Sequence, residues 1–189
     1  DFKEAVKWYR KAAEQGGAFA QHSLGAMYAT GRGVPEDFKE AVKWYRLSAE
    51  LGFDKAQNNL GVMYAAGRGV KQDFKEAVKW YRKSAEQGNA NGQASLGAMY
   101  ANGLVVEKDF KLEILLEKDS KEAAKWFRKS AEQGNANGQY NLGMMYATGQ
   151  GVEKDFKEAA KWFRKLAEQG DALGQFTLGT MYATGQGVE

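Results

Sequence analysis

The chain repeats one segment of 36 residues, and this repetition limits its possible folds more than any other feature. The copies cover residues 1–36, 37–72, 73–118, 119–154 and 155–189. A fixed period between about 20 and 50 residues is typical of solenoids, in which each unit buries its apolar face against its neighbours. The pattern therefore predicts one all-α solenoid domain of five helix-turn-helix repeats over residues 1–189. It also indicates a binding scaffold as the class of function.

The first half of each repeat predicts a helix, called helix A below, that begins with a capping box. In the first repeat, Asp1 can accept a hydrogen bond from the backbone N–H of Glu4, and the Glu4 side chain can reach back to the cap. Apolar residues follow at the spacing of one buried stripe, at Phe2, Ala5, Val6, Tyr9, Ala12 and Ala13. Gly16 is expected to end the helix in the left-handed conformation.

The second half of each repeat predicts another helix, called helix B, which runs from about Ala18 to Thr30 in the first repeat. A glycine within a helix costs roughly 0.5–1 kcal/mol relative to alanine, so its recurrence needs a compensating reason. The glycine occurs in every repeat, at Gly25, Gly61, Gly97, Gly143 and Gly179. Because Gly25 and Ala29 share one face, we expect a flat strip on which another helix can pack closely. A Gly-x-Gly-Val turn then leads to the next repeat.

The third repeat departs from this pattern after Gly103, where the second glycine of the turn is lost. Ten extra residues follow near 109–118, and they contain Leu-Glu-Ile-Leu-Leu, formally an LxxLL docking motif. Such leucine spacing arises readily in any helix. We therefore expect Asp109 to begin a longer helix A of about 25 residues, which would add roughly 15 Å at the helical rise.

The recurring motif Lys-Glu-Ala-x-Lys-Trp-[Tyr/Phe]-Arg, followed by Leu-Gly-x-Met-Tyr-Ala-x-Gly-x-Gly-Val, resembles that of the Sel1-like repeat family. The resemblance covers the chain except for the insert near 109–118. It implies a right-handed α/α superhelix, related to tetratricopeptide proteins, with the A helices on the concave side. It also implies adaptor or scaffold roles, often in bacterial periplasmic, secreted or envelope proteins. Nothing specific to the family's cysteine-rich branch transfers, because this chain has no cysteine.

Charge and composition limit the possible partners. The chain has 27 basic and 24 acidic residues, and this near balance argues against a dedicated nucleic-acid binder. No apolar run approaches the roughly 20 residues that a membrane span needs. The first residue is Asp1, without a signal-like segment, so the chain resembles an excerpt cut at repeat boundaries or an engineered repeat array.

No combination of residues predicts catalysis or a bound cofactor. The only histidine, His22, is replaced in the other repeats by Asn58, Ala94, Tyr140 and Phe176, a variety that suggests a surface position. The repeated serines at Ser48, Ser84 and Ser130 are interpreted as small residues at the edge of the core. A phosphate loop, a zinc-binding HExxH motif and an EF-hand loop are all missing from the sequence. We therefore predict no enzyme activity, no metal and no cofactor.

Lysine and arginine residues line one face of every helix A, opposite Tyr9, and we call this surface the cationic face. Its members are Lys3, Lys7 and Arg10 with their equivalents Lys39, Lys43, Arg46, Lys75, Lys79, Arg82, Lys121, Lys125, Arg128, Lys157, Lys161 and Arg164. One interpretation is a solvated helix face that is partly neutralised by Glu4 and Glu14. The other is a groove for an acidic peptide or a polyanion, with Lys43, Arg46, Lys79, Arg82, Lys125 and Arg128 as candidate contacts.

Helix B offers a second candidate surface, at the positions that vary between repeats. These positions hold Phe19, His22, Val62, Tyr140, Met144, Leu173 and Phe176. Exposed aromatic residues beside variable polar ones suit a contact surface, which makes Tyr140 and Phe176 the candidates. The alternative is that some of them fill the space between neighbouring B helices, and this alternative is favoured for Met144.

These observations favour a non-catalytic scaffold that binds a peptide or protein through its concave face. Two alternatives stay open: a polyanion or nucleic-acid binder that uses the cationic face, and an engineered array without a native partner. The two ends of the chain predict a further interaction. Because the first repeat presents Phe2, Val6 and Trp8, and the last keeps Trp162, Leu178 and Tyr182, we expect the chain to associate end to end.

Overall fold

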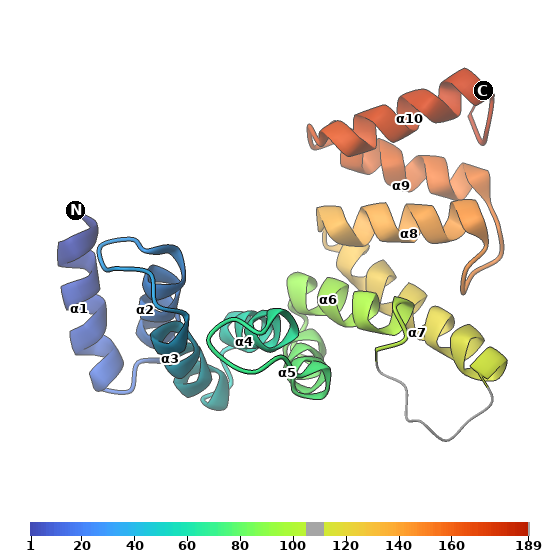
Figure 1. The fold of residues 1–189 in the computed structure, drawn as a ribbon. Coiled ribbons are helices and arrows are strands. Elements are labelled where there is room, and N and C mark those ends of the chain that lie inside the picture. The colour runs from blue at the N-terminus through green and yellow to red at the C-terminus, as the bar shows by residue number, and fades with distance from the viewer. Residues whose placement is uncertain (105–111, 189) are drawn as a thin grey trace. The chain divides into compact units, whose positions relative to one another are not determined.

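The chain folds as an α-helical repeat protein. A computed structural model describes residues 1–104 and 112–188 (Figure 1). The helices are α1 (Phe2–Glu14), α2 (Ala18–Thr30), α3 (Phe38–Glu50), α4 (Asp54–Ala66), α5 (Phe74–Glu86), α6 (Ala90–Ala101), α7 (Leu112–Glu132), α8 (Ala136–Thr148), α9 (Phe156–Glu168) and α10 (Ala172–Thr184). Helices with odd numbers are A helices and those with even numbers are B helices. Strands are absent from the described ranges, so the predicted all-α solenoid class is confirmed.

The helices form two compact units, Asp1–Gly92 and Gln93–Glu189. In the first unit, α1 packs against α2, α2 against α3, α3 against α4, and α4 against α5. In the second unit, α7 to α10 pack in the same sequential manner. Each repeat therefore contacts its neighbours in sequence, as expected for a solenoid.

The predicted capping box is half correct. Asp37 accepts hydrogen bonds from the backbone N–H groups of Lys39 at 2.9 Å and Glu40 at 3.1 Å. The predicted return bond from the Asp37 backbone N–H to the Glu40 side chain is wrong. That N–H group donates instead to the Tyr28 carbonyl of α2 at 3.0 Å. Glu40 instead forms an ion pair with Lys43. The cap therefore ties helix A to the preceding helix B, and the caps of α5 and α9 repeat this arrangement.

The glycine within helix B lies where consecutive repeats meet. A Cβ atom on Gly25 would lie 2.7 Å from the ring of Tyr45 and 3.2 Å from the Ala41 carbonyl of α3. The close approach predicted from the sequence is confirmed, and the group that occupies the space is an aromatic ring. The same contact joins Gly61 to Tyr81, Gly97 to Phe127 and Gly143 to Phe163. We call this contact the ring-on-glycine joint.

The second glycine of each turn allows the chain to pass close to helix A of the same repeat. Gly69 has a φ of +70°, and a Cβ atom there would lie 2.2 Å from the Phe38 carbonyl oxygen. A side chain would therefore be strained by the backbone conformation and would also clash with the backbone of α3. The third repeat has valine at the equivalent position, residue 105, which lies outside the described residues.

The sequence suggested that the repeated serines lie at the edge of the core, and this interpretation is wrong. Ser48 and Ser84 are fully buried. The Ser48 hydroxyl donates to the Ala18 carbonyl at 2.7 Å, and the Ser84 hydroxyl donates to the Asp54 carbonyl at 2.8 Å. Both acceptors lie in the first turn of the preceding helix B, so these serines fasten one repeat to the previous one.

Glutamine side chains form a second bond across the joints. The Nε2 group of Gln87 donates to Oε1 of Gln57 at 2.7 Å, and Gln169 donates to Gln139 at 3.1 Å. In the first joint the donor position is occupied by Leu51. The buried Oε1 atom of Gln21 is consequently left without a hydrogen bond from the described residues.

Leu51→Gln is expected to raise the free energy of unfolding by about 0.5–1.5 kcal/mol, because it supplies the donor that Gln21 lacks. Chemical denaturation of the wild type and the variant measures this difference. The matched control is Leu51→Met, which keeps an apolar side chain. Equal stability of the glutamine and methionine variants would contradict the assignment of Gln21 as an unsatisfied group.

Helix α7 has 21 residues, whereas α1, α3, α5 and α9 have 13. The expectation of a longer helix A in this repeat is therefore confirmed. Its predicted first residue, Asp109, lies outside the described residues. The side chains of the LxxLL segment, Leu112–Leu116, lie outside the described part of the structure as well, and the docking interpretation stays untested.

Candidate functional site

One lysine of the cationic face in each helix A forms an ion pair within its own helix. Lys43 Nζ lies 3.3 Å from Glu40 Oε1, and Lys79 Nζ lies 3.0 Å from Glu76 Oε1. All the described pairs of this kind are spaced i,i+3 and are largely exposed: Lys7–Glu4, Lys43–Glu40, Lys79–Glu76, Lys125–Glu122 and Lys161–Glu158. Exposed pairs add little to stability, so a carboxylate from a partner can replace the glutamate at little cost.

The arginines of the same face are held by tyrosines from helix B. Arg46 Nη2 donates to the hydroxyl of Tyr64 at 2.6 Å, and Arg164 donates to Tyr182 at 2.7 Å. The equivalent pairs Arg10–Tyr28 and Arg128–Tyr146 are also hydrogen-bonded. Sequence analysis missed this pairing, although arginine and tyrosine recur 18 residues apart in each repeat. Each of these tyrosines therefore fixes the position of one guanidinium group.

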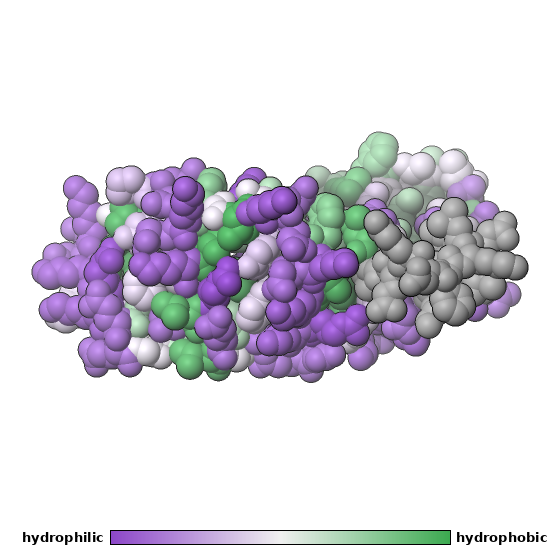
Figure 2. All heavy atoms as spheres, turned by 60° about the horizontal axis from the view of Figure 1, so that its bottom comes forward, coloured by the Kyte–Doolittle hydropathy of each residue, from purple (hydrophilic) through white to green (hydrophobic). Residues whose placement is uncertain are grey.

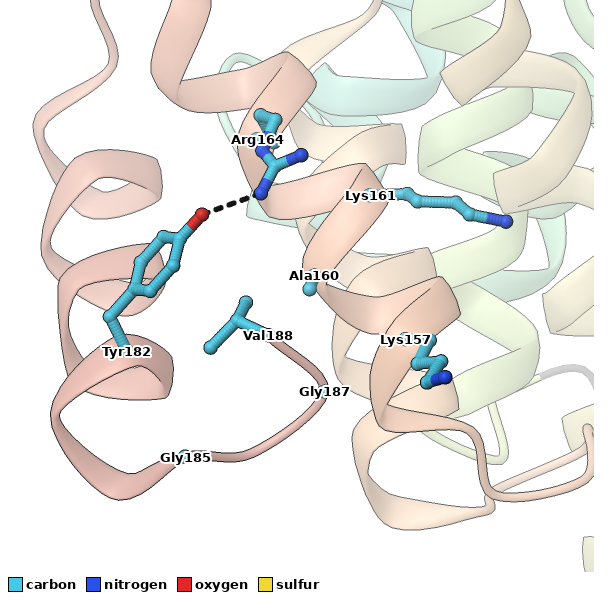
Figure 3. A pocket seen from close by; sticks show the side chains of 8 residues that line it. All are labelled: Lys157, Ala160, Lys161, Arg164, Tyr182, Gly185, Gly187 and Val188. Atoms are coloured by element: carbon cyan, nitrogen blue, oxygen red, sulfur yellow. Dashed lines mark hydrogen bonds between the residues drawn. The ribbon is translucent and has the colours of Figure 1, made fainter.

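In the fifth repeat the cationic face opens into a hollow of about 470 Å³ (Figure 3). Ala160 and Val188 contribute its apolar part, and the Arg164–Tyr182 pair forms one side. Lys161 extends away from Val188 in Figure 3. Its ammonium group donates a hydrogen bond to the Glu158 carboxylate, and this bond raises the pKa of Lys161. The lining residues include three cations, Lys157, Lys161 and Arg164, and no carboxylate. The hollow therefore suits an anionic group attached to a small apolar one.

The fourth repeat has a larger hollow of about 770 Å³ in the corresponding place. Its lining includes two of the candidate residues, Lys125 and Arg128, together with Trp126 and Lys129. The Lys129 ammonium lies 4.5 Å from the centroid of the Trp126 ring. With Lys121, the lining contains four lysines and arginines, and it also contains two glutamates, Glu122 and Glu132. The charged residues of the hollow therefore sum to a net charge of +2 (4 − 2).

The candidate residues of the variable helix B surface lie in different environments. Tyr140 is partly buried, and its ring centroid lies 6.0 Å from that of Phe163 in the following helix A. Phe176 is 72% exposed on α10. Neither Tyr140 nor Phe176 is among the residues that line the two cationic hollows. Their role in binding stays a prediction.

The interpretation of His22 as a surface residue is wrong. Its ring lies 5.2 Å from Phe53 and 5.7 Å from Tyr45 between centroids, and its Nε2 atom lies 3.1 Å from Nδ2 of Asn59. These neighbours belong to the second repeat, so His22 helps to fill the joint. Since the Asn59 amide nitrogen is a donor, this contact favours a neutral ring. Burial lowers the pKa of His22 below 6.5, and the nearby Lys55 lowers it further, while Asp54 opposes both effects.

His22 should make stability depend on pH. The unfolded chain binds this proton more tightly than the folded chain, because folding lowers the pKa of His22. The free energy of unfolding is therefore expected to fall as the pH decreases from 6.5 to the pKa of the folded state. Denaturation at a series of pH values measures this slope. His22→Asn, which introduces the residue found at the equivalent Asn58, should reduce the slope, and an unchanged slope would contradict the assignment.

Polar side chains dominate one face of the first unit. On the face drawn in Figure 2, hydrophilic residues cover most of the first unit, and hydrophobic residues show in separate groups between them. Within residues 1–104 and 112–188, His, Asp and Glu residues form no group of three that could hold a metal ion. None of the helices in those ranges is long and apolar enough to cross a membrane.

The paired helices and the joints between them define an α-helical repeat protein. The sequence matches the family description Sel1 repeat over residues 1–17, 18–53, 54–89, 90–112, 114–135, 136–171 and 172–189. The chain therefore belongs to the Sel1 repeat family, and the predicted family is confirmed. The full family units begin at helix B and end after the next helix A, so each contains one ring-on-glycine joint. A comparison with curated protein sequences found no match.

Solved structures of bacterial proteins show the same fold. The chain is 46% identical to c5321, a protective antigen of uropathogenic Escherichia coli, with a TM-score of 0.86, and covers 38% of that protein. It is 34% identical to a Sel1 repeat protein from Oxalobacter formigenes, with a TM-score of 0.85, and covers 71% of it. Both alignments include 100% of the present chain. Cysteine-rich protein B from Helicobacter pylori is 27% identical over 76% of this chain and 96% of its own, with a TM-score of 0.55.

Proposed function

We propose that the chain is a non-catalytic scaffold that binds acidic segments of partner proteins through the cationic faces of its A helices. Membership of the Sel1 repeat family supports a protein partner. The observation that carries the proposal is the recurrence of a cationic hollow beside α7 and beside α9. Two successive repeats thus offer the same kind of pocket to successive acidic side chains of one extended segment.

The chemistry of the hollows favours carboxylates attached to a polypeptide. Arg128 and Arg164 are positioned by tyrosine hydroxyls, which lowers the entropy lost when they bind a carboxylate. The apolar lining of the hollows can bury the methylene groups that precede a glutamate carboxylate. The chain's net charge of +3 is small for a protein that binds nucleic acid mainly through phosphates.

The test is a titration of fluorescein-labelled peptides, followed by fluorescence anisotropy. A peptide of alternating glutamate and serine is expected to bind, and its affinity should fall as salt is added. The matched peptide of alternating glutamine and serine should not bind. Tighter binding of a random DNA duplex than of the glutamate peptide would instead favour the polyanion function. No binding of the glutamate peptide at low salt would contradict the proposal.

We propose a second copy of the chain as a further protein partner. The supporting observation is that the first and last repeats expose faces whose equivalents are buried in the other repeats. Trp8 on α1 is 59% exposed, whereas its equivalents Trp44 and Trp80 are 7% and 6% exposed. Sedimentation velocity over a concentration series tests this self-association. The average mass should rise with concentration, and a mass that stays that of the monomer would contradict it.

A further inference from the structure

The joint between the first two repeats exposes a group of apolar side chains. Leu51 follows α3 and is 60% exposed, and Leu47, one helical turn earlier, is 39% exposed. Phe19 on α2 is 64% exposed. Phe53 lies two residues after Leu51, and its ring centroid lies 6.1 Å from that of Phe19. We call these four residues the apolar patch.

The same positions are polar in the neighbouring repeats. Lysine replaces Leu47, glutamine replaces Leu51, asparagine replaces Phe53, and lysine or asparagine replaces Phe19. The equivalents of Leu47, Leu51 and Phe19 are exposed as well, namely Lys83, Lys129, Gln87, Gln133, Lys55, Asn91 and Asn137. Exposure is therefore a property of these positions in every repeat, and only this joint fills them with apolar residues. Exposed apolar residues gathered in one place are typical of an interaction surface.

A buried acceptor without a partner lies beside Leu51. Gln21 is 5% exposed, and its Nε2 group donates to the Ala13 carbonyl at 3.2 Å. The equivalent amide of Gln57 is held in the same way, and its Oε1 atom accepts from Gln87, which occupies the position of Leu51. The Oε1 atom of Gln21 therefore faces Leu51, and it receives no hydrogen bond from the described residues. A ligand that covers the patch and donates one hydrogen bond here would satisfy a group that the chain leaves unpaired.

Carboxylates border the apolar patch. Glu50 is exposed directly before Leu51, and Asp54 directly follows Phe53. Helix α3 ends at Glu50, so the partial negative charge of its last carbonyl groups lies at the same place. Lys55, next to Asp54, is the cation nearest to the patch along the chain and offsets one of these charges. The border of the patch is thus acidic, opposite in sign to the cationic face, and favours a basic residue on the ligand.

We infer that the apolar patch binds a partner segment that presents a tryptophan beside a lysine. Tryptophan combines a large apolar ring with one N–H donor and no acceptor, as the unpaired Gln21 Oε1 requires. The indole packs on Leu51 and Phe53, its N–H donates to Gln21 when the Leu51 side chain turns aside, and Phe19 extends the apolar surface beyond Phe53. The lysine of the segment meets Glu50. This site is separate from the acidic-segment site and does not depend on it.

The first experiment titrates a fluorescein-labelled peptide, Gly-Ser-Leu-Trp-Lys-Ser-Gly, and follows its fluorescence anisotropy. The wild type is expected to bind it. Leu51→Gln restores the donor of the other joints and removes an apolar contact, so it should weaken binding by at least about tenfold. This variant is expected to be more stable than the wild type, so the loss cannot come from unfolding. Phe19→Asn, which introduces the residue of the equivalent Asn91, should also weaken binding. No saturable binding to the wild type, or unchanged affinity of both variants, would overturn the inference.

The second experiment isolates the hydrogen bond to Gln21. The same peptide with its tryptophan methylated at the indole nitrogen keeps the ring but lacks the donor. The wild type should bind it roughly two- to tenfold more weakly, the usual contribution of one neutral hydrogen bond. The difference should vanish in Leu51→Gln, where Gln21 is already bonded. Equal binding of the two peptides by the wild type would overturn the assigned contact.

The cationic face provides the control for the place of binding. Lys125→Glu combined with Arg128→Glu alters the hollow of the fourth repeat and should leave the affinity for the tryptophan peptide unchanged. A loss in this double variant as large as that in Leu51→Gln would place the peptide on the cationic face and overturn the inference. Failure of the glutamate–serine peptide to bind would contradict the acidic-segment proposal and leave this one standing.

Discussion

Gly61→Leu is expected to lower the free energy of unfolding by about 1–3 kcal/mol, the usual cost of inserting a side chain into a packed core. A Cβ atom at this position would lie 2.6 Å from the Tyr81 ring and 3.2 Å from the Ala77 carbonyl. Tyr81 is buried, and the glycine, the ring and the α5 backbone are all in contact, so the ring has little room to move. The leucine must therefore push α4 and α5 apart or displace the ring from the joint.

Gly179→Leu provides the matched control, because the same substitution is made at the equivalent position of α10, where no atom of the described residues lies within 4 Å of the place of a Cβ atom. There the change should stabilise the helix by roughly 0.5–1 kcal/mol, since glycine is a poor helix former. Thermal and chemical denaturation at low protein concentration measure both effects. If both variants lose the same stability, or Gly61→Leu loses none, the ring-on-glycine joint does not explain the recurring glycine.

Lys125→Glu combined with Arg128→Glu is expected to weaken binding of the glutamate–serine peptide by at least about tenfold. The two reversals replace charge-assisted hydrogen bonds, each of which contributes about 1.5–3 kcal/mol, with repulsion between carboxylates. Both residues line the hollow of the fourth repeat. The residues are exposed, so the helical circular dichroism should be unchanged.

Two controls separate this site from a general effect of charge. Lys55→Glu combined with Lys71→Glu changes the net charge by the same amount at exposed positions away from the cationic face, and it should leave the affinity nearly unchanged. Tyr146→Phe keeps both cations but removes the hydroxyl that holds Arg128, so a smaller loss is expected. Equal losses for the two double variants would mean that only the net charge matters. Binding that survives the reversal at low salt would move the site to the helix B surface.

The sequence predicted the local structure of this chain well. The period, the apolar stripes and the glycines predicted helices near their observed bounds, including helix B at Ala18–Thr30. Contacts within one helix, such as the Lys43–Glu40 pair, were also predictable, because their spacing of three residues defines their geometry. The glycine pattern indicated a close approach but could not identify the Tyr45 ring as the group that approaches.

The contacts that join helices were not predictable in this way. The Arg46–Tyr64 bond and the bond from Ser48 to Ala18 link positions 18 and 30 residues apart, and their geometry depends on how the helices pack. His22 was misplaced because variation between repeats was taken as a sign of exposure. Its neighbour Phe53 is replaced by asparagine or aspartate in later repeats, so both sides of the joint vary together. Variation in a repeat protein can therefore mark a buried joint as well as a free surface.

The most direct test of the acidic-segment proposal is to observe the arginine side chains while the glutamate–serine peptide binds. NMR spectra of protein labelled with nitrogen-15 at arginine report each Nε–Hε group separately. The proposal predicts that Arg128 and Arg164 shift progressively during the titration. The signals of Arg32 and Arg68 should stay unchanged, because these arginines lie in the turns, over the rings of Phe2 and Phe38. Shifts confined to Arg32 and Arg68, or no shift at saturating peptide, would contradict it.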